Sequence, residues 1–418
     1  MPNRRRVRIN NNPDQERGKY MSNLKEVLYN EIKLRSDIGV EGVRFDPQIF
    51  KSVLEKDSNI AATHNCMDFS LDDTANEQIP GGFRLEHGIG AQLNKNSRSS
   101  YYLEEEDGTI YLKNDGVTLS KVEVTKASPL YSKQTSDGTS MKTIVAAGDG
   151  LYGDKQILVA YSNECALKDK GLDCLFCNIN ATKDRFAKKE NIEWKNPKQI
   201  AETVKAAYDL EYNHLTITGG FIPERREVEY YLDTAETIRE YLGTDTFNGT
   251  ACIGAPQDLA VLEKYKEAGF STVGINLEVW NKDFFKAICP GKAQLCGGYD
   301  NWIKAIDYAI QVFGPGNVRS NFVPGLEPKE YLLEGIETLA EKGVVATAAL
   351  SWVPNIGSKL EGHRTPTPEW HWDVQQKIYR ILRKYGRTFK EVYNATPGAI
   401  ILHDFYKVDD ELLPAFHK

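Results

Sequence analysis

Three closely spaced cysteines are the residues of this sequence best suited to chemistry. Cys165, Cys174 and Cys177 follow the apolar run Gln156–Tyr161, with eight residues between the first two cysteines and two between the last two. The stretch around them is polar, whereas a cysteine without a chemical role is usually buried among apolar side chains. Three thiols after a predicted strand therefore indicate a metal site.

Two kinds of metal site suit these thiols. Structural zinc takes four protein ligands, commonly two Cys-x-x-Cys pairs or one such pair with histidines. One pair is present, no second pair exists, and the next histidine, His214, belongs to another predicted element. An iron–sulfur cluster held by three cysteines leaves one iron open for a substrate or cofactor. The residues alone leave open a cluster, a zinc ion or unliganded thiols.

The pattern Cys165…Cys174-Leu-Phe-Cys177 resembles the cluster loop of the radical S-adenosylmethionine (radical SAM) enzymes. In that family the residue before the last cysteine is usually aromatic, as Phe176 is here. The first gap departs from the family pattern, because eight residues stand where three are most common. The resemblance implies a [4Fe-4S] cluster on the three cysteines, S-adenosylmethionine at the open iron, and Phe176 beside the cofactor.

Composition limits the other possibilities. The chain has 418 residues, 41% of them hydrophobic and 27% charged, as expected for a soluble globular protein of two or three domains. The net charge of −7 gives no overall basic surface, so nucleic acid is an unlikely partner. No apolar run approaches the ~20 residues of a membrane span, and no apolar signal region begins the chain. We expect a cytoplasmic protein with reduced or metal-bound cysteines and no membrane contact.

The chain divides into four predicted parts. Residues 1–22 are expected to be a disordered basic tail, and residues 23–153 a small mixed, mostly β domain with Asp-Gly turn signals. Residues 154–360 repeat strand, loop and helix, which predicts a parallel sheet with right-handed crossovers. Residues 361–418 are expected to form a helical extension.

The repeating part predicts an α/β fold, a partial (β/α)6 TIM-type barrel of the radical SAM type, preceded by the small mixed α/β domain. In such a barrel the chemistry lies at the carboxyl ends of the strands. The six predicted strands are Gln156–Tyr161, His214–Thr218, Gly249–Ile253, Ser271–Val279, Val318–Val323 and Val344–Trp352.

The second and fourth predicted strands carry residues that the resemblance assigns to the cofactor. Gly219-Gly220 follows strand two, where family members let the backbone meet the amino group of S-adenosylmethionine. Glu278, near the end of strand four, resembles a glutamate that holds the cofactor's amino acid or ribose. Asn276 shares its face by strand alternation. The alternatives are an ordinary turn for the glycines and a structural ion pair for Glu278.

The fifth and sixth strands supply the other predicted cofactor contacts. Arg319 and Asn321 point the same way, and a planar guanidinium suits the carboxylate of S-adenosylmethionine. The resemblance places Pro324 and Gly325 beside adenine. Trp352 is predicted to cover the adenine ring, with core packing as the alternative.

Four further cysteines are expected to be dispensable for this cluster. Cys289 and Cys296 flank a short segment after strand four and, with Cys252 or Cys66, could instead hold a second cluster. Their spacing matches no auxiliary-cluster pattern.

The implied activity is reductive cleavage of S-adenosylmethionine at the cluster to a 5′-deoxyadenosyl radical. The radical would abstract hydrogen from a small-molecule substrate, in a lyase- or transferase-type reaction of a biosynthetic pathway. An electron donor such as flavodoxin or ferredoxin is implied, and no individual catalytic residue is predicted. The alternatives are a zinc- or cluster-stabilised barrel acting as a binding protein, and transfer of another fragment of S-adenosylmethionine.

Overall fold

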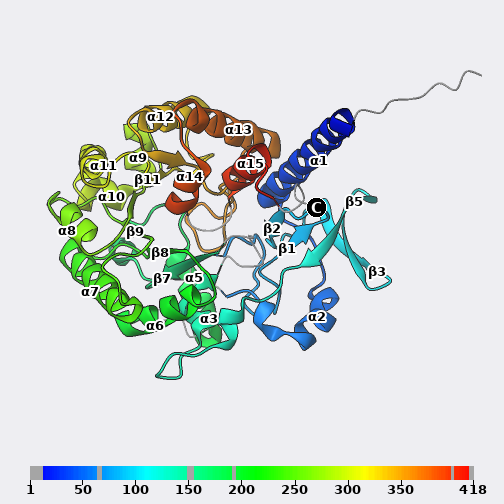
Figure 1. Ribbon diagram of the computed structural model, residues 1–418, viewed down its shortest axis with the longest axis horizontal. Coiled ribbons are helices and arrows are strands. Elements are labelled where there is room, and N and C mark those ends of the chain that lie inside the picture. Colours follow the sequence, from blue (N-terminus) through cyan, green and yellow to red (C-terminus); the bar gives the residue numbers. More distant parts are fainter. Residues whose placement is uncertain (1–12, 64–67, 148–154, 191–193, 397–399, 414–418) are drawn as a thin grey trace, which may run out of the picture.

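The computed structural model describes residues 13–63, 68–147, 155–190, 194–396 and 400–413, and this part contains two β-sheets (Figure 1). The larger sheet has the order β12-β11-β10-β9-β8-β7-β6, and all its neighbours are parallel except β6 and β7. Its strands are β6 (Ala146–Ala147), β7 (Gln156–Ala160), β8 (His214–Thr218), β9 (Gly249–Ile253), β10 (Thr272–Ile275), β11 (Val318–Asn321) and β12 (Val345–Thr347). The sequential order of six parallel strands confirms the partial barrel.

Helices cover the outside of these strands, as Figure 1 shows for the arc from α6 to α13. The connecting helices are α4 (Ala166–Asp169), α5 (Ile179–Glu190), α6 (Pro197–Tyr208), α7 (Glu224–Leu242), α8 (Val261–Glu267), α9 (Lys282–Ile288), α10 (Pro290–Leu295), α11 (Gly298–Phe313) and α12 (Lys329–Glu341). Local sequence explains their ends. Asn196 and Gln199 form a capping box at the start of α6, and Gly243 ends α7 in a left-handed conformation.

Strands two and three have the predicted bounds, whereas the other four, strand four among them, are shorter than the sequence predicted. We expected Ser271–Val279, whereas β10 ends at Ile275, and Glu278 joins Phe322 only through an isolated bridge. Glu278 has a φ of +71°, which a strand residue cannot adopt. The apolar pattern alone did not reveal this change of backbone direction.

The smaller sheet is antiparallel, with the order β2-β1-β5-β4-β3. Its strands are β1 (Gly82–Leu85), β2 (Gly90–Gln92), β3 (Tyr101–Glu106), β4 (Thr109–Asn114) and β5 (Val117–Val124). Short helices precede and follow it in the chain, namely η1 (Pro47–Phe50), α2 (Lys51–Lys56), η2 (Ser58–Ile60), η3 (Pro129–Ser132) and α3 (Met141–Ile144). The last two contact α6 of the barrel. Residues 23–153 are mixed as expected but not mostly β, because helices hold more of the described residues there than strands do, and β6 belongs to the barrel sheet.

The first helix corrects one expectation. Helix α1 (Pro13–Glu41) begins inside the predicted tail of residues 1–22, so disorder is wrong for residues 13–22, while residues 1–12 lie outside the described part. The helix is long because its carboxyl-terminal half packs against α13 and α15, which gives it tertiary support. Periodicity within the polar first turns could not show that support.

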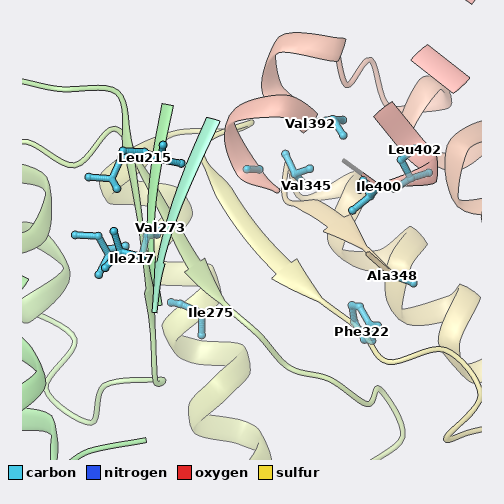
Figure 2. Close-up of a cluster of buried hydrophobic side chains, with 14 of the residues drawn as sticks. Leu215, Ile217, Val273, Ile275, Phe322, Val345, Ala348, Val392, Ile400 and Leu402 are labelled. Carbon is cyan, nitrogen blue, oxygen red and sulfur yellow. The ribbon is translucent and has the colours of Figure 1, made fainter. Parts of the chain in front are cut away.

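The part predicted to be a helical extension contains the helices α13 (Pro368–Lys384), α14 (Phe389–Ala395) and α15 (Ile401–Asp409). Figure 2 shows Val392, Ile400 and Leu402 from this region close to strand residues such as Val345. Helix α14 meets the amino-terminal ends of the strands, because the side-chain Nε2 of Gln156 donates to the carbonyl of Tyr393 and the Thr250 hydroxyl to that of Asn394. We call this end of the barrel the floor. Among the described residues, no helix is both long and apolar enough to span a bilayer.

A buried ion pair joins the two ends of the described chain. Arg35 of α1 contacts Asp404 of α15, and their side chains are only 8% and 7% exposed. Removing one partner from such a pair leaves an uncompensated charge in a water-poor place.

Asp404→Ala should therefore lower the free energy of unfolding by about 3 kcal/mol. The control is Lys25→Ala, because Lys25 of α1 pairs with Glu411 just after α15, and both side chains are partly exposed. That change should cost no more than about 1 kcal/mol. Chemical denaturation measures both, and equal small losses would mean that the Arg35–Asp404 pair contributes no more than a surface pair.

Candidate active site

A cavity of about 570 Å³ extends through the barrel interior to residues of the amino-terminal region. Almost every residue that the sequence assigned to the site lines it, namely Cys165, Cys174, Phe176, Cys177, Gly219, Gly220, Asn276, Glu278, Arg319, Asn321 and Trp352. Pro324 and Gly325 do not. Convergence of residues so far apart in the chain agrees with the rule that parallel strands present their carboxyl ends at one edge.

The cysteine loop is held between two neighbouring segments. The amide of Leu175 donates to the carbonyl of Ile288 at 2.9 Å, and its carbonyl accepts from the amide of Leu360 at 3.1 Å. A hydrogen bond with the Cys289 thiol lowers the pKa of Cys174, whereas burial raises that of Cys289. Cys174 is therefore the easier of the two to ionise, and the thiolate is the form that binds metal.

The donor set suits an iron–sulfur cluster. No three His, Cys, Asp or Glu side chains in the described ranges converge on a single metal ion. A four-iron cluster requires no such convergence, because each thiolate binds a different iron. Cys165, Cys174 and Cys177 instead border one cavity, so the iron that they leave open would face that space.

Gly219 and Gly220 allow the cysteine loop to pack against the end of β8. A Cβ atom at Gly219 would overlap the ring of Tyr161. A Cβ atom at Gly220 would overlap the carbonyl of Glu164 and lie 3.0 Å from Cβ of Cys165. The glycine pair thus has a packing role that the sequence did not predict, alongside its predicted cofactor role.

Glu278 forms an ion pair at the mouth of the barrel. Nζ of Lys292, from α10, lies 2.9 Å from Oε1 of Glu278, and both side chains are 13% exposed. The ammonium also donates to the carbonyl of Asn276 and lies 4.3 Å from the centre of the Trp302 ring. Burial acts to lower the pKa of Lys292, but the charge and hydrogen bond of Glu278 together with the neighbouring Cys174 and Cys289 outweigh it, and the pKa is raised.

Sequence reasoning missed Lys292. It lies between Cys289 and Cys296 in an unremarkable helical segment, and only its nearness to those cysteines could have drawn notice. Together, Glu278 and Lys292 place one negative and one positive group on the wall of the cavity, near Cys174.

Asn276 and Asn321 join adjacent segments at the strand ends. The amide of Asn321 donates to Oδ1 of Asn276 at 3.2 Å, and Oδ1 of Asn321 accepts from the amide of Ala349 at 2.9 Å. Nδ2 of Asn276 also lies 3.6 Å from the sulfur of Cys252. The two asparagines therefore support the mouth of the barrel as well as lining it.

Arg319 points toward the floor. It lies in β11, and its Nη1 donates to the carbonyl of Ala395 at the end of α14, at 3.0 Å. The cysteine loop lies at the opposite end of the strands. This direction does not support the predicted contact between Arg319 and the carboxylate of S-adenosylmethionine.

The remaining predicted residues occupy the segment after β11 and β12. The Pro324 carbonyl accepts from the amide of Trp352, and Gly325 packs against Pro366 with a φ of +107°, outside the cavity. Trp352 borders the cavity and is 7% exposed. A role beside adenine stays a prediction for all three.

Glu227 is a second residue that sequence reasoning missed. This buried carboxyl group of α7 borders the cavity, and both its oxygens lie 3.3 Å from the amide of Gly254. Burial raises its pKa to about 8. The helical pattern could not distinguish Glu227 from the exposed acids around it, because burial depends on how α7 packs against β9.

The other cysteines form no common group in the described residues. Cys252 borders the cavity, Cys289 and Cys296 are buried, and Cys66 lies outside the described residues. A second cluster therefore gains no support.

Gly220→Ala should displace the cysteine loop and reduce the iron content of the reconstituted protein by at least half, because the added methyl group overlaps the carbonyl of Glu164. Gly39→Ala is the matched control, since nothing lies within 4 Å of a Cβ atom there. Iron and sulfide analysis checks both variants. Full iron content in Gly220→Ala would show that the loop can move away without losing the cluster.

The raised pKa of Glu227 predicts that the free energy of unfolding depends on pH. Its raised pKa means that the folded protein holds this proton more tightly than the unfolded chain, so the associated stability is complete below about pH 4.5 and declines as the pH rises through 8. Glu227→Gln should remove this decline, on the order of 4 kcal/mol between pH 5 and pH 8. Thermal unfolding at several pH values measures it, with exposed Glu229→Gln on the same helix as control. If the stability of the wild type and of Glu227→Gln changed with pH in the same way, Glu227 would not be protonated in the folded protein.

Comparison with known proteins agrees with this geometry. A family model of the radical SAM superfamily matches residues 161–347. Bacteriochlorophyllide c C-7(1)-hydroxylase from Chlorobaculum limnaeum is 31% identical over 278 residues, which span 62% of this chain and 67% of the hydroxylase.

Two solved structures are also similar. Methylornithine synthase (PylB) has a TM-score of 0.43 and 18% identity, covering 59% of this chain and 69% of that one. The FeFe-hydrogenase maturase HydG from Carboxydothermus hydrogenoformans has a TM-score of 0.43 and 16% identity, covering 58% and 56%. On the family-model match and the identity to the hydroxylase, this chain belongs to the radical SAM superfamily, whose members use a [4Fe-4S] cluster and S-adenosylmethionine.

Proposed function

We propose that the chain cleaves S-adenosylmethionine reductively at a cluster on Cys165, Cys174 and Cys177, and that the resulting 5′-deoxyadenosyl radical removes hydrogen from a small-molecule substrate. The observation that carries this proposal is the shared cavity, which brings the three cysteines and a larger space together inside one barrel. The protein's own residues bind and orient the reactants and exclude water.

Glu278 and Lys292 are well placed to hold the amino-acid part of the cofactor. S-adenosylmethionine carries an ammonium and a carboxylate, and this pair offers one group of opposite charge to each. Exchanging a protein ion pair for two ion pairs with the ligand keeps every buried charge compensated. Lys292 thus replaces Arg319 as the proposed partner of the cofactor carboxylate.

The substrate would occupy the part of the cavity closed by the amino-terminal region. That wall includes the apolar residues Ile60, Ala61, Phe69, Ile79, Leu93 and Ala127 among polar ones such as Asp68 and Lys126. The apolar residues exclude water from a reactive radical and favour a substrate with an apolar body.

The hydroxylase name of the similar protein favours oxidation at a C–H bond in this chain as well, in a biosynthetic pathway. A lyase- or transferase-type reaction finds no comparable support. The one-electron reductant proposed here is a small redox protein such as flavodoxin or ferredoxin.

Cys174→Ala should lose the cluster and the formation of 5′-deoxyadenosine from S-adenosylmethionine under reducing, anaerobic conditions. Cys296→Ala should retain both, because Cys296 is buried and does not border the cavity. Chromatography of the products measures 5′-deoxyadenosine. A colourless, zinc-containing wild-type protein would favour a binding protein instead. Cleavage without 5′-deoxyadenosine would favour transfer of another fragment of the cofactor.

Glu278→Gln should fold, retain its iron and bind S-adenosylmethionine at least tenfold more weakly, a loss of about 1.4 kcal/mol. The substitution keeps the shape of the side chain and removes the charge that the ammonium would meet. Asp300→Asn is the control, because Asp300 also pairs with a lysine but on the exposed surface. Anaerobic titration measures the affinities, and unchanged affinity in Glu278→Gln would leave that residue as a purely structural partner of Lys292.

A further inference from the structure

Arg319 is a buried cation on the cavity wall that the proposed reaction leaves without a role. Its side chain is 6% exposed and borders the cavity. Its Nη1 donates to the Ala395 carbonyl, whereas its Nε has no partner within the described part of the chain. A guanidinium taken out of water is costly unless an anion or several acceptors compensate it.

No protein anion meets Arg319 in the described residues. Gly274 of β10 lies beside its side chain, Cys252 of β9 lies beside that glycine, and helix α14 supplies a carbonyl. His214 of β8 lies on the same floor, and burial together with the charge of Arg319 lowers its pKa to about 3, so it is neutral. The described floor therefore holds one permanent positive charge with no carboxylate paired to it.

A second donor without a partner faces the same interior. Thr216 of β8 is fully buried and borders the cavity, and its hydroxyl has no hydrogen-bond partner among the described residues. The Thr216 hydroxyl and the Nε–H of Arg319 are donors without a partner among the described residues, and such donors recognise an anionic oxygen.

We propose that Arg319 binds a carboxylate of the substrate at the floor of the cavity. The inference rests on the proposed function only in calling the bound molecule the substrate. A planar guanidinium matches a carboxylate through two parallel hydrogen bonds. The cofactor carboxylate is the less suitable ligand, because the cluster that anchors it lies at the opposite end of the strands.

This placement sets the orientation of the substrate. The Cα atom of Arg319 lies two residues before the end of β11, or about 7 Å along the strand, and its side chain extends further toward α14. A substrate anchored there would reach up the barrel axis and present its apolar end to the cofactor at the cysteine loop. The substrate class is thus a carboxylic acid with an apolar body.

Sodium benzoate is a suitable probe, with benzamide as its neutral analogue. Cluster-loaded protein is first saturated with S-adenosylmethionine, so that the cofactor's own carboxylate site is filled. Benzoate should then raise the Tm measured by anaerobic calorimetry, because a ligand of the folded state stabilises it, and benzamide should raise it far less. Arg319→Met should abolish the benzoate shift.

The matched control is Arg387→Met, since the guanidinium of Arg387 also bonds main-chain carbonyls but lies outside the cavity. That variant should keep the full benzoate shift. Arg319→Lys retains the positive charge but not the planar pair of donors, so it should keep only part of the benzoate shift. This variant provides the test if Arg319→Met does not fold. A full shift in either Arg319 variant, or equal shifts by benzoate and benzamide in the wild type, would overturn the proposal. None of these outcomes depends on cleavage of S-adenosylmethionine, so failure here is separate from failure of the proposed function.

Discussion

Close packing between the cysteine loop and the end of β8 is the contact on which the site depends. Tyr161 and Glu164 approach Gly219-Gly220 so closely that a side chain on either glycine would overlap them. This approach directs Cys165 toward the barrel interior rather than toward solvent. The long first gap between cysteines is accommodated because part of it forms the short helix α4.

Charges inside the barrel are separated by depth. Glu278 and Lys292 compensate each other at the mouth, Glu227 holds its proton beside Gly254 just past the end of β9, and Arg319 carries its charge to the floor. Each arrangement reduces the free-energy cost of burying a charged group in a different way. A ligand therefore meets groups of different polarity along the barrel axis, and this order favours one orientation over its reverse.

The parts of this structure that depend on short-range pattern could be predicted from the sequence. The periodicity of apolar residues placed β8 and β9 correctly, and the cysteine spacing identified the loop. Residues whose role depends on tertiary packing, such as Lys292 and Glu227, could not be predicted from the sequence, because their neighbours come from distant segments. The direction of Arg319 was missed for a related reason. Strand alternation gives the face of a side chain, but not whether a long side chain extends toward the mouth or the floor.

The contact between α1 and α15 has a consequence for how the chain folds. Arg35 and Asp404 are 369 residues apart in sequence, yet they meet in the finished protein, and Tyr29 similarly reaches Asp409. During synthesis from the amino terminus, α1 cannot pack against α15 until the residues of α15 have been made. The barrel can assemble earlier, strand by strand, because its neighbours are sequential. The joining of α1 to α15 would then be a late step, which closes the molecule only after the cysteine loop and its cavity have formed.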